Sequence, residues 1–432
     1  MKFLGPCLSI AFSLLLICIV FASGATIHDG FAVRSLLSLL AAAALVFVGL
    51  SARAVDIKFA GQATARLKVV VALPALWMLI QILPIPFGAH SLWVYANEAL
   101  DQQALGHISI DLGATLQSLA YYLANITLIV VTLFVAKERK KAELILFVLA
   151  CVSIATTIAL LLEKTGLVAW PDAGDGVRSA ISALGILLCL ANAAGAMERL
   201  QGRNGEDEGP VKFILLASGI ALLFCIGGLA ISATLNVGLV AALGVLVFGS
   251  IQVVRRADLA NWATAVLVGT LFIAAAMITA WRYDATRMVS PFLQFASAAS
   301  ADAVSVTTRL LSDAGPRGTG AGTFAALVPL YKDLGGSITS APSTAAAFAI
   351  ELGWPMTLIL IAIAAWTTVV LYLGALNRGR DSFYSALAAA CVVILLGQTF
   401  CDASLLNSTV ATIADAVIGL GLAQRISART SP

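Results

Sequence analysis

Apolar stretches of about 20 residues follow one another along almost the whole chain, with short polar breaks between them. About 20 residues of α-helix cross the hydrocarbon core of a bilayer, which is roughly 30 Å thick. The stretches are apolar on all sides and lack the alternation of a membrane β-barrel. We therefore predict an all-α, polytopic integral membrane protein with about 12 transmembrane helices, at 4–24, 33–50, 69–87, 115–136, 144–163, 180–197, 213–231, 233–253, 260–281, 343–374, 382–401 and 408–424.

The composition excludes a soluble protein. Of the 432 residues, 60% are hydrophobic and 11% are charged, which leaves too little polar surface to cover a core in water. We expect a single transmembrane domain over residues 1–432, in contact with membrane lipids and with no nucleic acid as a partner. The seven cysteines lie in or beside apolar stretches and form no C-x-x-C pair, so we expect packing residues, no metal site and no cofactor.

Lysine and arginine are unevenly distributed between alternate loops. They gather in the breaks at 51–68, 137–141, 199–212, 255–256 and 378–380, and after the last stretch. The segment 88–114 contains neither. Because cytoplasmic loops are enriched in positive charge, this pattern predicts that both termini are cytoplasmic. Residues 1–24 also fit a cleaved secretory signal, an interpretation that leaves the downstream topology unchanged.

One long break, residues 282–342, separates the ninth and tenth stretches, and the topology places it on the side away from the cytoplasm. Such long loops are uncommon unless they are functional, so we expect a partly helical, folded subdomain here, with helix within 291–314. Cations are dense on a side where they are normally sparse, and the guanidinium group suits phosphate oxygens. The alternative is a solvated loop whose cations pair with its own aspartates. The cations are Arg282, Arg287, Arg309, Arg317 and Lys332.

Three glycines alternate in the same loop, at Gly318, Gly320 and Gly322. Glycine permits backbone turns that leave N–H groups free, and concavities of such N–H groups bind anions. Alternate glycines also occur in tight turns or where helices pack closely. No strand precedes the motif and no G-K-[ST] follows it, so it is not a nucleotide-binding fingerprint.

Two carboxylates fall inside predicted helices. Glu351 precedes Pro355 in the tenth stretch, where proline is expected to kink or interrupt the helix. A carboxylate at this depth is costly unless it is paired, protonated or in contact with water. Glu351 therefore either has a role in the site or bonds to backbone groups that the proline leaves free. Asp415 lies near the middle of the last stretch, an intramembrane acid of unknown role.

Three stretches together resemble the O-antigen ligase and polymerase family of bacterial envelopes. The first is Leu-Pro-Ile-Pro-Phe at 83–87 followed by His-Ile-Ser-Ile-Asp-Leu-Gly-Ala-Thr at 107–115, the second is Gly-Thr-Gly-Ala-Gly-Thr-Phe at 318–324 with Tyr331 shortly after, and the third is Glu-Leu-Gly at 351–353. The resemblance implies a twelve-helix enzyme of the bacterial inner membrane that moves a glycan from an undecaprenyl pyrophosphate carrier to an acceptor. The chain departs from the family in two places. Ala-Pro-Ser at 341–343 stands where the family has a segment with its catalytic histidine, and residues 234–238 lack the arginine that many members of the family have there.

The resemblance implies periplasmic transfer without a metal, for which the donor is a lipid-linked glycan and the acceptor a glycan or a lipid. Glu351 is our first candidate for the base, and His90 or His107 is the second. The alternatives are a transporter or flippase for a lipid-linked sugar or small anion, and a non-catalytic scaffold of a polysaccharide assembly complex. The residues expected to hold the donor phosphates are Arg178, Arg282, Arg287, Arg309, Arg317, Gly318, Gly320 and Gly322.

Overall fold

The structure is a computed structural model of the chain. It describes residues 4–26, 28–65, 67–85, 88–101, 105–167, 174–201, 209–256, 290–296, 299–332, 340–377 and 381–425.

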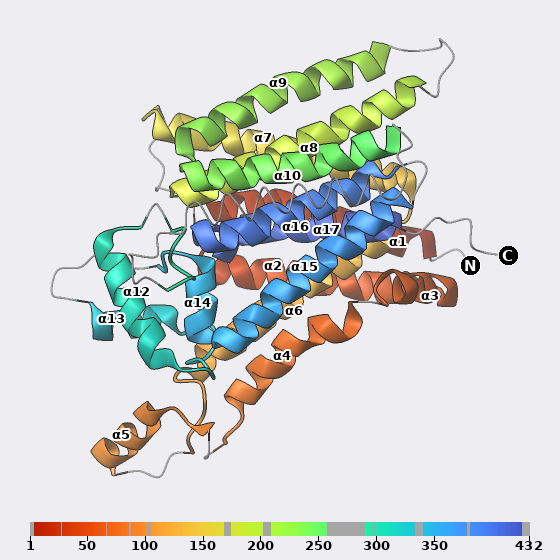
Figure 1. The fold of residues 1–432 in the computed structure, drawn as a ribbon. Helices are drawn as coiled ribbons and strands as arrows, with labels where there is room; N and C mark the ends of the chain where they lie inside the picture. Colours follow the sequence, from red (N-terminus) through yellow and green to blue (C-terminus); the bar gives the residue numbers. More distant parts are fainter. Residues whose placement is uncertain are drawn as a thin grey trace.

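Long helices lie side by side in a bundle, and most of the short helices lie at one of its ends (Figure 1). The long helices are α1 (Leu4–Ala22), α2 (Phe31–Ser51), α4 (Lys68–Ile82), α6 (Leu112–Val135), α7 (Arg139–Lys164), α8 (Asp175–Gln201), α9 (Gly209–Ser232), α10 (Leu235–Arg256), α15 (Trp354–Leu376), α16 (Phe383–Cys401) and α17 (Ser408–Arg425). The short ones are α3 (Ala54–Ala63), α5 (Ser91–Leu100), α12 (Ala301–Ala314), α13 (Phe324–Tyr331), α14 (Thr344–Glu351) and the 3-10 turns η1 (Ser23–Thr26) and η3 (Ser404–Leu406).

The prediction of an all-α, multi-pass membrane protein is confirmed. Within the described ranges, nine helices are long and apolar enough to cross a membrane: α1, α2, α6, α7, α8, α9, α10, α15 and α16. A tenth candidate is the pair α3 and α4, bent by 82°. α17, with Asp415 at its middle, is not among the nine, and the predicted helix 260–281 lies outside the described residues. The described chain contains no strand, only an isolated bridge between Pro84 and His107.

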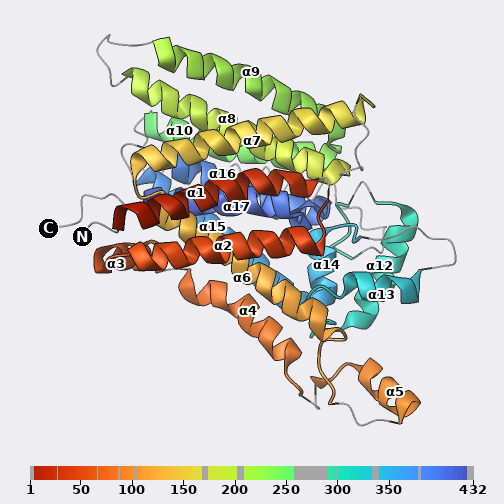
Figure 2. The same cartoon turned by 180° about the vertical axis from the view of Figure 1, so that it is seen from behind.

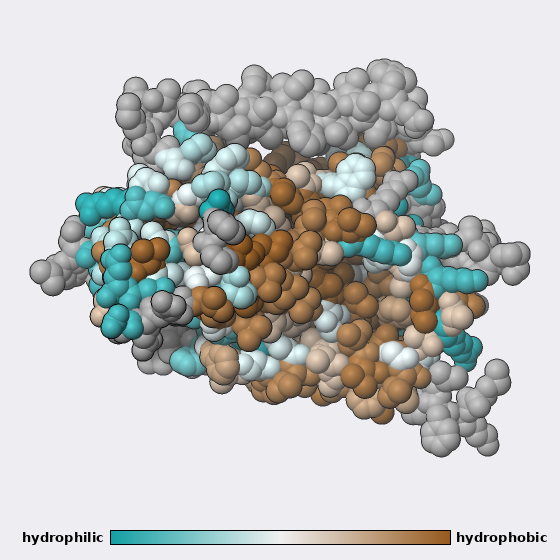
Figure 3. Space-filling view, turned by 90° about the horizontal axis from the view of Figure 1, so that it is seen from below, coloured by the Kyte–Doolittle hydropathy of each residue, from teal (hydrophilic) through white to brown (hydrophobic). Residues whose placement is uncertain are grey.

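The first helix, α1, and the last helix, α17, are antiparallel neighbours. The Thr409 hydroxyl at the start of α17 donates to the carbonyl of Ala22 at the end of α1. At the opposite end of the bundle, the Gln424 amide donates to the carbonyl of Ala136, just after α6. α1 therefore begins, and α17 ends, at the end of the bundle away from α12, α13 and α14, as Figure 2 also shows. On the face seen from below, hydrophobic side chains cover the middle and hydrophilic ones gather toward the two ends (Figure 3).

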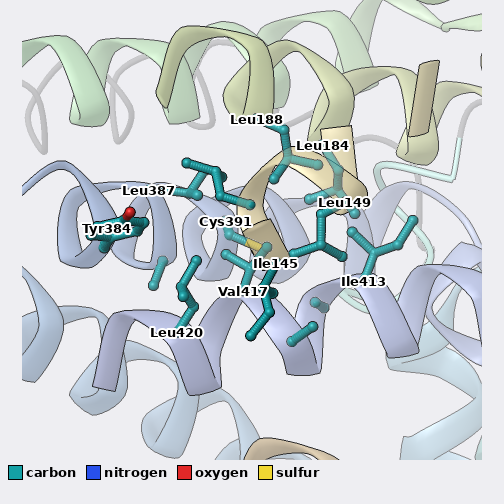
Figure 4. Packing of buried hydrophobic residues seen from close by; sticks show 14 of the residues in the cluster. Ile145, Leu149, Leu184, Leu188, Tyr384, Leu387, Cys391, Ile413, Val417 and Leu420 are labelled. Carbon is teal, nitrogen blue, oxygen red and sulfur yellow. The ribbon is translucent and has the colours of Figure 1, made fainter. Parts of the chain in front are cut away.

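The core is built on α16. In the most apolar stretch of α16, 78% of the residues are buried, whereas the corresponding values are 22% in α2 and 17% in α9. α16 is therefore interior, while α2 and α9 face the surroundings. Leucine, isoleucine and small side chains of α7, α8, α16 and α17 interlock around Cys391 (Figure 4). Cys391 is 1% exposed, consistent with its prediction as a packing residue.

The structure divides the predicted helix 343–374 into two helices, so the membrane-spanning part begins later than predicted. α14 ends at Glu351 and α15 starts at Trp354. Gly353 between them has a φ of 87°, a left-handed conformation that ends a helix, and Pro355 then occupies the first turn of α15, where its missing N–H is harmless. The membrane-spanning helix therefore begins after the break, and Glu351 lies outside it.

The described part of 282–342 is folded. α12 falls within 291–314, as predicted, and packs with α13 and α14 around its own small apolar core of Val306, Leu310, Phe324 and Ile350. The short helices α3 and α5 lie in segments that the sequence predicted as loops, and α4 ends at Ile82, five residues before its predicted end of 87.

Candidate functional site

Residues 318–324, here called the glycine loop, are shaped by close contacts at three positions. Gly318, Gly320 and Gly322 have φ values of 73°, 110° and 79°, which L side chains rarely adopt. A Cβ atom at these positions would overlap, respectively, the backbone around Glu351, the side chain of Ser109 and the hydroxyl of Ser118. The glycines are therefore required both by conformation and by packing.

The glycine loop pairs with the end of α14 through its backbone. The N–H of Thr319 donates to the carbonyl of Ile350, and that of Gly320 to the carbonyl of Glu351, both at 2.9 Å. On its other side, the carbonyl of Thr319 accepts the N–H of Ile110, also at 2.9 Å. The loop is thus held between α14 and the segment that leads into α6.

The carboxylate of Glu351 closes this arrangement. The N–H of Phe324 donates to its Oε1 at 3.2 Å, and the N–H of Gly322 also bonds to the carboxylate. Burial raises the pKa of Glu351 to about 7, and the two N–H donors oppose that shift. The N–H groups of Gly322 and Phe324 are therefore bonded to a carboxylate of the chain itself, and binding of donor phosphates by the three glycines stays a prediction.

Gln81, which the sequence reasoning missed, ties α4 to the same place. Its side chain is 0% exposed. Its Nε2 donates to the carbonyls of Arg317, at 3.2 Å, and of Glu351, at 3.0 Å, while its Oε1 accepts the N–H of Ala321 at 3.2 Å. The available signal was an amide within an otherwise apolar predicted helix, because such a group needs internal partners.

The segment after α5 completes the junction. The backbone N–H of Ser109 donates to the carbonyl of Gln81 at 3.1 Å, and its hydroxyl lies 2.7 Å from that of Thr115 in α6. Nδ1 of His107 lies 2.7 Å from the carbonyl of Ile82. Three stretches far apart in sequence, at 81–111, 317–324 and 351–353, therefore meet at the end of α4. We call this set of contacts the glycine-loop junction.

The two candidate histidines lie beside this junction. His107 contacts Trp93, with ring centroids 5.5 Å apart. His90 caps α5, because its Nδ1 accepts the N–H of Leu92 at 3.3 Å, and its backbone N–H donates to the carbonyl of His107. Burial lowers the pKa of His90, which favours its neutral form. Within the described ranges, no group of three or more His, Cys, Asp and Glu side chains is placed to hold a metal ion.

The candidate arginines are divided between two places. Arg309 in α12 and Arg317 beside Gly318 are exposed on the folded part of the loop. Arg178 in α8 is 7% exposed and makes ion pairs with Glu163, at 2.7 Å, and with Asp175, at 2.8 Å. Arg282 and Arg287 lie outside the described residues.

The start of α8 is on the same end of the bundle as the glycine-loop junction. A Cβ at Gly176 would lie 3.2 Å from the side chain of Asp402, and the carbonyl of Asp402 accepts the N–H of Thr344 at the start of α14. The buried Arg178 cluster therefore lies at this end of the bundle but not on the exposed surface that carries Arg309 and Arg317.

Asp415 lies apart from the junction. It is 8% exposed and lines a cavity of about 510 Å³ between α4, α6, α15, α16 and α17. The cavity wall also carries Phe348 of α14, a residue three positions before Glu351.

The fold defines the class of the protein as a multi-pass α-helical membrane protein with a polar, hydrogen-bonded junction at one end of its helix bundle. No protein-family model and no curated protein matches the sequence.

Proposed function

We propose that the protein transfers a glycan from an undecaprenyl pyrophosphate carrier to a glycan or lipid acceptor on the periplasmic side of a bacterial inner membrane. The reaction is the polymerisation or ligation of a surface polysaccharide. The proposal includes a layout of about 12 helices, with the loop 282–342 on the periplasmic side and both termini in the cytoplasm.

One observation carries this proposal: the three stretches on which the family resemblance rests are in contact. Gln81, two residues before the first stretch, bonds to backbone groups of the second and third, across up to 270 residues of sequence. Segments that only happened to match the family would have no reason to meet in space. Their assembly into one junction is what a shared site requires.

The charges around the junction fit a phosphorylated lipid. Arg317 is exposed next to Gly318, and Arg309 is exposed on α12, which packs with α13 and α14 at the end of the bundle where the carrier's pyrophosphate has to lie. A guanidinium group makes two parallel hydrogen bonds to phosphate oxygens. The opposite end carries Arg53, Lys137 and Arg139, in keeping with the excess of positive charge on cytoplasmic faces.

The chemistry is a substitution at the anomeric carbon of the donor sugar. The acceptor hydroxyl oxygen forms the new bond, the bond from the anomeric carbon to the pyrophosphate oxygen breaks, and the lipid pyrophosphate leaves with the electron pair. A base takes the hydroxyl proton. Glu351, whose pKa burial raises to about 7, suits a base that works near neutral pH, and His90 or His107 is the second candidate.

The test is replacement of Arg309 and Arg317 by alanine, one at a time, in the cell that makes the polysaccharide. We expect less polymer or shorter chains at equal protein level, because transition-state charge is no longer held. Arg53→Ala, an exposed arginine at the other end, is the matched control. Polymer of normal amount and length from both variants would remove the proposal.

A carrier is the second candidate function, and the cavity at Asp415 is the observation that favours it. Purified protein in vesicles separates the possibilities. Glycan transfer without translocation supports the enzyme, translocation without transfer supports a carrier, and neither activity without partner proteins supports a scaffold.

A further inference from the structure

The cavity beside Asp415 has the size and lining of a small-molecule site. Its volume of about 510 Å³ lies within the range of roughly 300–1,000 Å³ typical of ligand pockets. Aliphatic side chains from five helices make most of its wall, among them Val71, Ile126, Leu360, Leu395 and Ile418. A few polar groups interrupt this lining, as in pockets that orient an amphiphilic ligand.

Asp415 is the unsatisfied group in that wall. Its Oδ2 atom is buried without a hydrogen-bond partner, and the part of the chain that the structure describes offers the carboxylate no ion pair. The other charged residue of the wall, Lys68, lies at the very start of α4, whereas Asp415 is at the middle of α17. An ionised carboxylate in such a place is costly until a proton or a cation neutralises it.

The groups that face Asp415 do not supply that cation. The titratable side chains that interact with it are Cys18 of α1, Tyr121 and Tyr122 of α6, and Cys391 of α16, all uncharged when protonated. The hydroxyl of Tyr122 donates to the carbonyl of Val71 at 2.7 Å, which fixes its ring in the cavity wall. The faces of such rings attract organic cations.

A bare metal ion does not suit this cavity. Hard cations require six or more oxygen ligands in a tight shell, whereas this wall is mainly aliphatic. A ligand that fills the space must be largely apolar, and one that satisfies Asp415 must carry a positive charge.

We infer that this cavity binds an organic cation with an apolar body, such as a hydrophobic ammonium, whose charge pairs with Asp415. The inference stands independently of the proposed glycan transfer. Where the resting carboxyl holds a proton, binding releases it: the neutral acid and the ammonium cation become a carboxylate–ammonium pair and one free proton. Cation and proton therefore compete for one site, and affinity falls as the pH falls.

The experiment uses the purified full-length protein in lipid nanodiscs and tetrapentylammonium as the probe, followed by titration calorimetry. We expect saturable binding of one probe per chain. Asp415→Asn keeps the shape of the side chain but not its charge, and should weaken binding at least tenfold. Asp415→Glu should stay within a few-fold of wild type. Asp402→Asn, at a buried acid that does not line the cavity, is the matched control and should bind like wild type.

Two further measurements complete the test: one checks that each variant is folded, and the other follows the pH dependence of binding. Each variant is compared with wild type by size-exclusion profile and thermal unfolding. In wild type, repeating the titration at falling pH should weaken binding by up to about tenfold per pH unit, the limit for competition with a single proton. No saturable binding to wild type, equal binding to a folded Asp415→Asn variant, or affinity independent of pH would each overturn the inference.

Discussion

Gln81 offers the sharpest test of the glycine-loop junction. Methionine has a similar length and shape but neither donates nor accepts comparable hydrogen bonds, so Gln81→Met removes three bonds and little volume. The carbonyl of Arg317 and the N–H of Ala321 then lose their bond to Gln81, whereas the carbonyl of Glu351 loses one of its two donors and keeps the N–H of Gly320.

The size of the effect follows from these three bonds. Hydrogen bonds between helices of membrane proteins average about 0.6 kcal/mol and reach about 1.7 kcal/mol. Three of them therefore give a loss of about 2 to 5 kcal/mol in the free energy of unfolding. The upper part of this range applies if the orphaned groups stay buried away from water.

The assay is equilibrium unfolding in mixed micelles, titrated with sodium dodecyl sulfate and followed by tryptophan fluorescence. Gln252→Met in α10 is the matched control, because Nε2 of Gln252 is buried without a hydrogen-bond partner among the described residues. That variant should be neutral or slightly stabilised. Amide hydrogen exchange should rise at 317–324 in Gln81→Met alone. Equal stability of the two variants, with exchange unchanged, would refute the proposed role of Gln81.

Three further predictions use the same unfolding titration. Gly320→Ala should destabilise the protein by about 2 kcal/mol or more, because alanine is strained at this φ and its Cβ would overlap Ser109; unchanged stability of this variant would argue against the contact. Folded Glu351 keeps its proton to higher pH than the unfolded chain does, so its contribution to the free energy of unfolding should fall between about pH 4.5 and pH 7, by an amount on the order of 3 kcal/mol. Glu351→Gln should lack this fall. Parallel pH profiles of the wild type and the variant would contradict the buried carboxyl. Arg178→Gln should lower the free energy of unfolding by about 3–5 kcal/mol, because it leaves Glu163 buried without its ion-pair partner. The double variant with Glu163→Gln should lose less than the sum of the two single variants. Strict additivity would show that the pair is not coupled.

The bundle was predictable because lipid imposes one strong rule on the chain. Each long apolar run must satisfy its backbone internally, so hydrophobicity alone placed most of the long helices within a few residues of their observed bounds. The break at 352–353 was harder to place. Pro355 correctly signalled an interruption, but the helix ends at Glu351, before the proline, because Gly353 adopts a left-handed conformation beside Pro316 and Gly318.

The junction was only half visible in the sequence. The glycines and Glu351 stood out, but whether the glycines bind an anion or allow close packing remained open. The structure shows the close packing, and binding of an external anion stays a prediction. Gln81 did not stand out because its three partners lie more than 230 residues away. No local pattern around residue 81 encodes such contacts, since they depend on how α4, α14 and the loop subdomain come together.

The long separation between Gln81 and Glu351 also has a consequence for biosynthesis. The ribosome makes α4 some 270 residues before the carbonyl that Gln81 binds. At typical elongation rates of 5–20 residues per second, this interval lasts roughly 15–50 s. Throughout that time a polar amide sits at the tip of a nascent membrane helix, and water or lipid headgroups must solvate it until the last third of the chain arrives.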